Sequence, residues 1–139
     1  TRGSDSIAIQ EIAATDFEEY REVNELILQG RKLGSDILIA QAKDSTTYDT
    51  VVISKAADAM LAMSGIEASF VLAKNTQGFI SISARSRSKI NVQRIMEELG
   101  GGGHFNLAAA QIKDMSLSKV GEKLTQLILD ELKEKEKEE

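Results

Sequence analysis

The hydrophobic and polar positions of this chain follow two different periods, and the change between them predicts the order of its elements. Short runs that are apolar throughout or alternate with polar positions, as expected for β-strands, occupy residues 6–12, 36–43, 68–74, 79–85 and 108–112. Longer segments with apolar positions every three or four residues, as expected for helices with one buried face, occupy residues 15–33, 51–63, 91–99 and 116–132. The predicted order is therefore β-α-β-α-β-β-α-β-α.

Two details of this pattern predict how the strands combine. Residues 37–40 are apolar without interruption, which is typical of a strand that is covered on both faces. Residues 75–78, Asn-Thr-Gln-Gly, have the composition of a turn between two antiparallel strands. A hairpin among alternating strands and helices predicts an α/β fold with a mixed β-sheet of about five strands, flanked by about four helices.

The same pattern predicts one domain with two short ends. Residues 6–132 are expected to fold as a single domain. Residues 1–5 are expected to be a linker or a remnant of cloning, and residues 133–139 a charged, disordered tail. No apolar run approaches the roughly 18 residues that a membrane-spanning helix needs.

Composition excludes several kinds of site. The 139 residues contain no cysteine and one histidine, which excludes disulfides, thiolate zinc sites, a cysteine nucleophile and a metal site with two histidines. Asp44, Asp49 and Asp58 are scattered along the chain, and their spacing matches no metal-binding motif. A net charge of −5 argues against binding to duplex DNA, which usually requires a basic face.

The most distinctive motif is a run of four glycines, residues 100–103, followed by the single histidine, His104. Successive glycine amides can surround an anion, because no Cβ atom blocks its approach. The alternative is a flexible connector after the preceding helix, for which Gly100 is a natural terminating residue.

A second motif lies at the end of the predicted hairpin. Residues 83–89, Ser-Ala-Arg-Ser-Arg-Ser-Lys, combine three cations with three hydroxyl groups. Strand alternation would place Ser83, Arg85 and Arg87 on one face, and arginine side chains pair well with phosphate oxygens. The alternative is an exposed strand edge whose charges discourage aggregation.

The spacing of the two motifs favours a shared site. One short helix separates the basic strand from the glycine run, so the chain can return to the sheet beside the strand that it left. Arg85, Arg87, the amides of residues 101–103 and His104 are therefore expected to converge on one anion.

These motifs resemble the DHH-associated domain, the smaller lobe of the DHH phosphoesterases. The resemblance rests on Ser-Ala-Arg-Ser at 83–86, Asn-Val at 91–92, the glycine–histidine motif at 100–104 and the alanines at 108–109. Residues 53–58 and 66–70 are most similar to the membrane-anchored cyclic-di-AMP phosphodiesterases of this family. The resemblance extends over roughly residues 6–130.

The resemblance implies a role for individual residues. Phosphate and nucleotide would be gripped at the cleft between two lobes by Arg85, Gly102, Gly103 and His104, with Ser83 and Ser86 beside them. Arg87 lies outside the family pattern, and its role in binding rests on the charge argument alone. No residue of this chain is expected to be catalytic.

The resemblance also implies what this chain lacks. Such enzymes hold two metal ions, usually manganese, in the other lobe, on a residue set that includes Asp-His-His, and no such sequence occurs here. The hypothesis is therefore that this chain is a substrate-recognition lobe that holds no cofactor and has no phosphodiesterase activity on its own. Its partners would be a DHH catalytic lobe and a cyclic dinucleotide or short oligonucleotide. The domain would be cytoplasmic, in a parent anchored to the plasma membrane, and a homodimer is left open.

The sequence leaves two alternative functions open. The first is an RNA-binding module, because the same domain occurs at the end of alanyl-tRNA synthetases, where it binds tRNA. The second is a non-catalytic interaction domain, which would bind no nucleotide.

Overall fold

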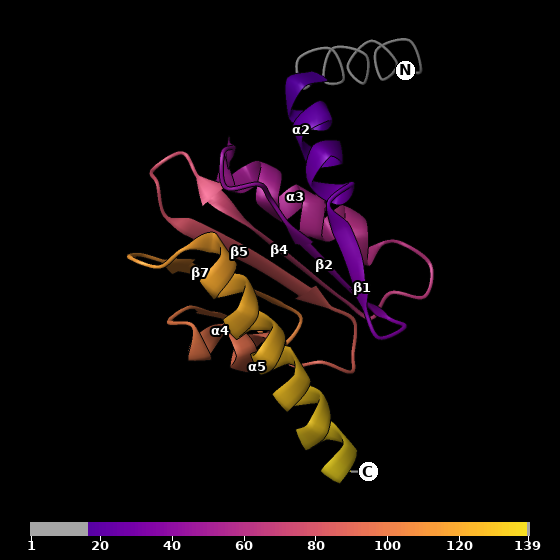
Figure 1. Ribbon diagram of the computed structural model, residues 1–139. Helices are drawn as coiled ribbons and strands as arrows, with labels where there is room; N and C mark the ends of the chain where they lie inside the picture. The colour runs from indigo at the N-terminus through magenta and orange to yellow at the C-terminus, as the bar shows by residue number, and fades with distance from the viewer. Residues whose placement is uncertain (1–16, 139) are drawn as a thin grey trace, which may run out of the picture.

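The computed structural model describes residues 17–138, so the strand predicted at residues 6–12 lies outside the described part. Helices lie on both sides of one mixed sheet (Figure 1). In chain order, the elements are α2 (Phe17–Ile27), β1 (Gly30–Leu33), β2 (Ile37–Gln41), β3 (Thr47–Tyr48), α3 (Thr50–Leu61), β4 (Ala68–Asn75), β5 (Ile80–Ser86), α4 (Val92–Glu98), β6 (Gly102–Gly103), β7 (Leu107–Ile112) and α5 (Leu117–Glu138). The predicted α/β class and mixed sheet are confirmed.

The strand order across the sheet is β1-β2-β4-β5-β7-β6, with the short β3 paired to β4. β4 runs parallel to β2 and β3, and every other pairing is antiparallel. The sheet has seven strands rather than the predicted five or so, because β1, β3 and β6 are short strands that periodicity did not reveal. The basic strand β5 and the glycine strand β6 are separated only by β7.

The first predicted helix was wrong in its second half. It was expected to reach Leu33, but α2 ends at Ile27 and residues 30–33 form β1. A Cβ atom at Gly30 would lie 2.9 Å from the Ile27 carbonyl oxygen, so the chain turns sharply there. β1 then pairs with β2 through Gly34, whose φ of +72° suits the turn.

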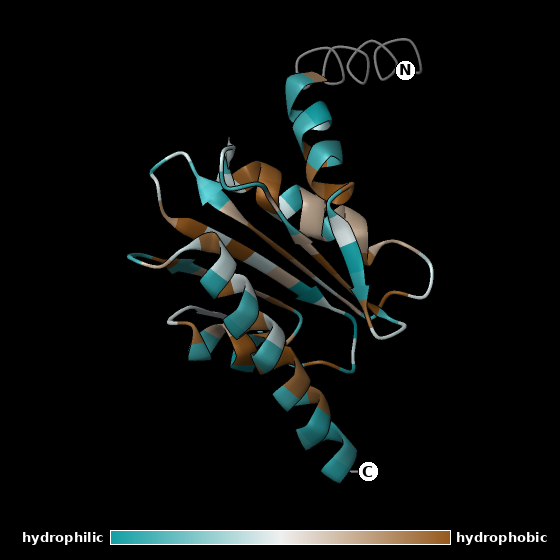
Figure 2. Cartoon of the chain, viewed as in Figure 1, coloured by the Kyte–Doolittle hydropathy of each residue, from teal (hydrophilic) through white to brown (hydrophobic). Residues whose placement is uncertain are grey.

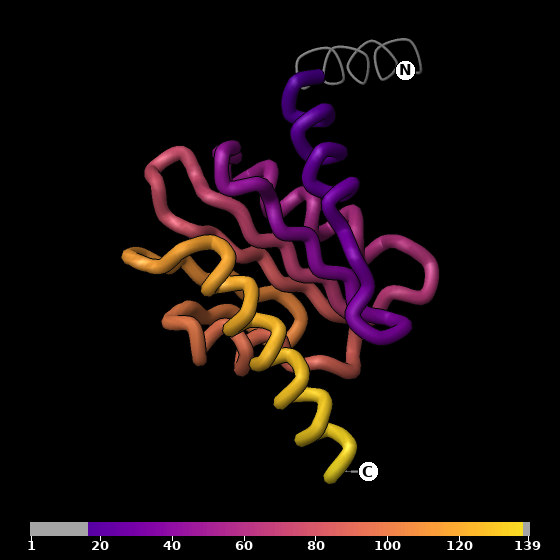
Figure 3. The backbone as a smooth tube through the Cα atoms, in the orientation of Figure 1, coloured from indigo at the N-terminus to yellow at the C-terminus, as the bar shows by residue number. Residues whose placement is uncertain are grey.

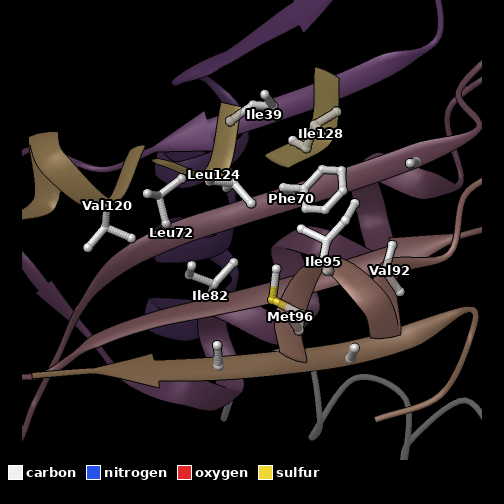
Figure 4. Packing of buried hydrophobic residues seen from close by; sticks show 14 of the residues in the cluster. Ile39, Phe70, Leu72, Ile82, Val92, Ile95, Met96, Val120, Leu124 and Ile128 are labelled. Atoms are coloured by element: carbon white, nitrogen blue, oxygen red, sulfur yellow. The ribbon is translucent and has the colours of Figure 1, made fainter. Parts of the chain in front are cut away.

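Two apolar cores lie on the two faces of the sheet. Figure 4 shows the larger core, in which Phe70 and Ile82 of the sheet pack against Ile95 of α4 and Leu124 of α5. The second core joins the other face to α3 and α2, through residues such as Ile53. α3 is mainly hydrophobic in Figure 2, as expected for a helix that lies between the sheet and α2. The strand at residues 37–41 contributes to both cores, which confirms that both its faces are covered.

The last helix, α5, is longer than predicted. Ser116 caps it, with its hydroxyl oxygen accepting from the Lys119 amide at 3.1 Å. The helix continues to Glu138, through residues for which the sequence predicted a disordered tail, because lysine and glutamate are good helix formers. The tube in Figure 3 shows the start of α2 and the end of α5 at opposite ends of the molecule. Among residues 17–138, no helix combines the length and apolarity that a membrane span requires.

Candidate phosphate-binding site

The glycine run is an ordered structure rather than a flexible connector. Gly100 ends α4 with a φ of +85°. Its amide donates to the Glu97 carbonyl at 3.1 Å, and the Gly101 amide donates to the Met96 carbonyl at 2.8 Å. This pair of bonds is the Schellman pattern of helix termination. Gly102 and Gly103 then form the edge strand β6.

The three glycines after the helix end have different surroundings. Gly101 and Gly103 lie so close to β7 that a Cβ atom would reach 2.7 Å from the Ala110 Cα atom and 2.6 Å from the Ala108 Cα atom, respectively. Gly103 also has a φ of +145°, which side chains rarely adopt. At Gly102, by contrast, a Cβ atom would meet no described atom within 4 Å. Packing therefore explains Gly101 and Gly103, but it does not explain Gly102.

His104 begins a tight turn that is fixed on three sides. Its amide donates to the Leu107 carbonyl at 2.7 Å, and the Leu107 amide donates back at 3.3 Å. The Phe105 carbonyl accepts from the Val92 amide at 3.0 Å, and the Asn106 carbonyl accepts from the Ser86 amide at 2.9 Å. Bonds from β7, the start of α4 and the end of β5 thus hold the backbone of residues 104–106.

The register of three strands brings the two sequence motifs together. Arg85 pairs with Leu107, and the mutual backbone bonds pair Leu107 with His104. Residues directly opposite one another in antiparallel strands project to the same face. Arg85 and His104 therefore lie in one row on one face, with their Cα atoms roughly 10 Å apart, since neighbouring strands are about 4.8 Å apart. The next row contains Ser83, Ala109 and Gly102.

This face is covered over β4 and β5 but open over β7 and β6. α3 packs on β4 and β5, and no described helix packs on the same face beyond them. Leu107, with 51% of its surface exposed, and Ala109 are accordingly solvent-exposed. The exposed surface of β7 and β6 that borders α3 is called the open face below.

Arg85 stands where the α3 wall meets the open face. Its side chain is only 9% exposed, and its Nε donates to Asp58 Oδ1 at 2.7 Å. Its Nη1 donates to the Ala84 carbonyl at 3.0 Å. One turn earlier on α3, the Ser54 hydroxyl lies 3.2 Å from that of Ser83. Sequence reasoning missed Ser54 and Asp58, although their i, i+4 spacing on one helix was a usable signal.

Ser86 and Arg87 are engaged elsewhere. The Ser86 hydroxyl donates to the Ile90 carbonyl at 2.6 Å and contacts the Phe105 carbonyl at 3.2 Å, which fastens the His104 turn. Arg87 donates from Nε to the Ile66 carbonyl at 2.9 Å and from Nη2 to the Leu61 carbonyl at 2.8 Å. It therefore holds the C-terminal end of α3. The register puts Ser83, Arg85, Gly102 and His104 on the same side of the sheet, with Gly102 and His104 at the open face and Ser83 and Arg85 buried beside α3. Ser86 and Arg87 instead make structural contacts.

Comparison with known proteins shows the family of this chain. Residues 34–138 match the model of the DHHA1 domain. The chain belongs to the DHHA1 domain family. It is 37% identical over 129 residues to cyclic-di-AMP phosphodiesterase GdpP of Geobacillus thermodenitrificans, which covers 93% of this chain and 20% of that protein. It is also 37% identical over 126 residues to cyclic-di-AMP phosphodiesterase PdeA of Listeria monocytogenes, covering 91% of this chain and 19% of the relative.

This DHHA1 domain thus spans about a fifth of the length of the curated relatives that it matches. Among solved structures, an exopolyphosphatase-related protein from Bacteroides fragilis superposes with a TM-score of 0.69 at 17% identity. That match covers 81% of this chain and 34% of the other, and it supports the fold alone.

The described residues do not fit the two-metal site that the family resemblance implies for a DHH lobe. Within the described residues, no group of three or more histidine, cysteine, aspartate or glutamate side chains could hold a metal ion. His104 is the single histidine of the chain, and its neighbours in the row are Leu107 and Arg85. The site can offer the guanidinium of Arg85 to an anion. The prediction that the Gly101 amide joins it is wrong, because that amide donates to the Met96 carbonyl, and the His104 amide likewise donates to the Leu107 carbonyl.

Proposed function

We propose that this DHHA1 domain is the substrate-recognition lobe of a cyclic-di-AMP phosphodiesterase. Two relatives at 37% identity are named cyclic-di-AMP phosphodiesterases. In this proposal, the domain binds the dinucleotide and a DHH lobe, belonging to the part of the relatives that this chain does not match, carries the manganese ions and cleaves the phosphodiester. Following the resemblance, the domain faces the cytoplasm in a parent anchored to the plasma membrane.

The observation that supports the proposal is the strand register, in which Arg85, Gly102 and His104 belong to two adjacent rows on one side of the sheet. Arg85 contributes the charge, because its Nη2 has no hydrogen-bond partner among the described residues. β6 is the edge strand of the sheet, so its outward backbone groups are not used by another described strand. The missing side chain of Gly102 leaves room for phosphate oxygens to approach those groups.

The same face offers an apolar floor for a base. Leu107 and Ala109 lie in the two rows that hold Arg85 and Gly102, and both are exposed. An adenine ring could pack on these aliphatic side chains, while its phosphate lies beside Arg85 and His104. With the base on aliphatic side chains and the phosphate beside Arg85 and His104, the site needs no aromatic residue in either row to stack on the base.

Isothermal titration of the chain with cyclic-di-AMP, linear diadenylate and a short single-stranded RNA tests the proposal. We expect saturable binding of the dinucleotides and no manganese-dependent hydrolysis. Binding to RNA without any response to either dinucleotide would replace the proposal with an RNA-binding module. Absence of binding to all three, together with self-association, would favour an interaction domain.

A further inference from the structure

Asp58 and Ser54 match the spacing of the strand on which they pack. Ser54 contacts Ser83, and Asp58 contacts Arg85, so residues four apart on α3 meet residues two apart on β5. Four helical residues advance about 6 Å, and two strand residues advance about 6.8 Å, so the two contacts stay in step. One turn of α3, from Ser54 to Asp58, therefore contacts β5 at both of its ends.

The contacts of Arg85 leave its guanidinium little freedom. Nε is bonded to Asp58 and Nη1 to the Ala84 carbonyl, while the side chain as a whole is 9% exposed. Of its three guanidinium nitrogens, Nη2 alone is not hydrogen-bonded to a described residue. An arginine that is free to rotate loses conformational entropy when it binds an anion, and one that is already fixed loses less.

We propose that Asp58 is a positioning residue, which holds the guanidinium of Arg85 so that Nη2 is directed to the open face. This inference rests on the proposed function, in which Arg85 binds phosphate. Asp58 itself needs no contact with the ligand. Its carboxylate accepts from Nε of Arg85, and Nη2 is left without a hydrogen bond to a described residue.

The negative charge of Asp58 opposes phosphate binding, whereas its hydrogen bond favours it. Its side chain is 62% exposed, so water and salt screen the repulsion. The bond to Nε needs only an acceptor oxygen, which asparagine also provides. Asparagine therefore keeps the positioning and removes the charge, whereas alanine removes both.

The test measures the affinity of the 139-residue chain for cyclic-di-AMP in wild type, Asp58→Ala and Asp58→Asn. We expect Asp58→Ala to weaken binding by about 2- to 10-fold, the effect of ordering one side chain on binding. We expect Asp58→Asn to bind at least as tightly as wild type. Asp44→Asn is the matched control, because Asp44 is an exposed carboxylate that pairs with Lys74 and lies far from Arg85 in the sequence.

A double-mutant cycle separates positioning from a general effect on the fold. In an Arg85→Ala background, Asp58→Ala should cause no further loss of affinity, because no guanidinium remains to be held. Alanine is the best helix former and the Asp58 side chain is mostly exposed, so α3 should stay folded. Circular dichroism checks this for each variant.

An NMR measurement keeps the inference testable without a ligand. The Nε–H proton of Arg85 should exchange slowly with water in wild type and in Asp58→Asn, and rapidly in Asp58→Ala. Rapid exchange in wild type would overturn the inference, as would equal loss of affinity in both Asp58 variants or an undiminished effect of Asp58→Ala in the Arg85→Ala background. Failure of wild type to bind cyclic-di-AMP would instead overturn the proposed function.

Discussion

Arg85 and His104 lie at the two ends of one cross-strand row, with Leu107 between them. They are 19 positions apart in the sequence, and α4 and the glycine run make up most of the intervening chain. Because antiparallel partners share a face, both side chains project from the same side of the sheet. The row places a cation, an apolar surface and an imidazole within the span of one nucleotide.

The glycine run offers the sharpest pair of substitutions. Gly103→Ala should lower the free energy of unfolding by about 1–3 kcal/mol, because its Cβ atom would overlap β7 and its φ is unfavourable. Gly102→Ala should change that free energy by less than about 0.5 kcal/mol, yet it should weaken cyclic-di-AMP binding. Urea unfolding and titration of both variants provide the measurements. Unchanged affinity in a folded Gly102→Ala protein would mean that this glycine does not approach the ligand.

Arg85 should matter for binding more than any other single cation. Arg85→Ala removes a charge-assisted hydrogen bond to phosphate, an effect of about 1.5–3 kcal/mol on the free energy of binding. Asp58, its partner, is largely exposed and stays hydrated after the substitution. Titration with cyclic-di-AMP, with Arg94→Ala as the control, measures the loss. Equal losses of affinity in Arg85→Ala and Arg94→Ala would show that Arg85 acts only through its long-range positive charge and makes no direct contact with phosphate.

Arg87 should contribute to stability and not to affinity. Arg87→Ala removes two hydrogen bonds to carbonyls at and beyond the end of α3, with an expected loss of about 1 kcal/mol in the free energy of unfolding. The folded variant should bind cyclic-di-AMP like wild type. A large loss of affinity in Arg87→Ala with unchanged stability would show that Arg87 binds the ligand, as its charge alone had predicted.

Tyr48 should make stability fall at alkaline pH. Burial raises the pKa of the Tyr48 hydroxyl, and the nearby Glu25 carboxylate raises it further. The folded state therefore keeps this proton above the unfolded pKa of about 10. The resulting stabilisation is complete below that pH and is lost as pH rises through the folded pKa. Urea unfolding between pH 8 and 11 should show a smaller alkaline loss in Tyr48→Phe than in wild type.

Tyr20→Phe is the control for this measurement, since Tyr20 is 70% exposed. At pH 8, Tyr48→Phe should also lose about 1 kcal/mol, because its hydroxyl donates to Glu25 Oε2 at 3.2 Å. An identical alkaline decline in wild type and Tyr48→Phe would contradict the assignment.

Periodicity predicted the long elements well, and local motifs predicted their ends. The hairpin of β4 and β5, the Asn91 cap of α4 and the positive φ of Gly100 all follow from short-range rules that the sequence displays directly. Strand alternation likewise predicted that Ser83 and Arg85 share one face, and the structure has them opposite the core that contains Ile80, Ile82 and Ala84.

Long-range pairing accounts for what could not be predicted. β1 forms because β2 is available beside it, and the apolar spacing of residues 15–33 carries no sign of that neighbour. Arg85 and Arg87 look equivalent in the sequence. The position of α3 makes them different, because Arg85 donates to Asp58 and Arg87 donates to carbonyls at and beyond the end of that helix. The edge strand β6 is similarly invisible, because glycine has no side chain to show a pattern.

The most direct test of the open face as a nucleotide site is an NMR titration of the ¹⁵N-labelled chain with cyclic-di-AMP. The amide signals of Gly102, His104 and Leu107, and the Nε–H signal of Arg85, should shift together along one saturation curve. The amide signal of Gly78, which lies in the hairpin turn at the other end of β5 from Arg85, should stay in place. Shifts confined to the groove between α4 and α5, around Arg94 and Glu131, would contradict the account.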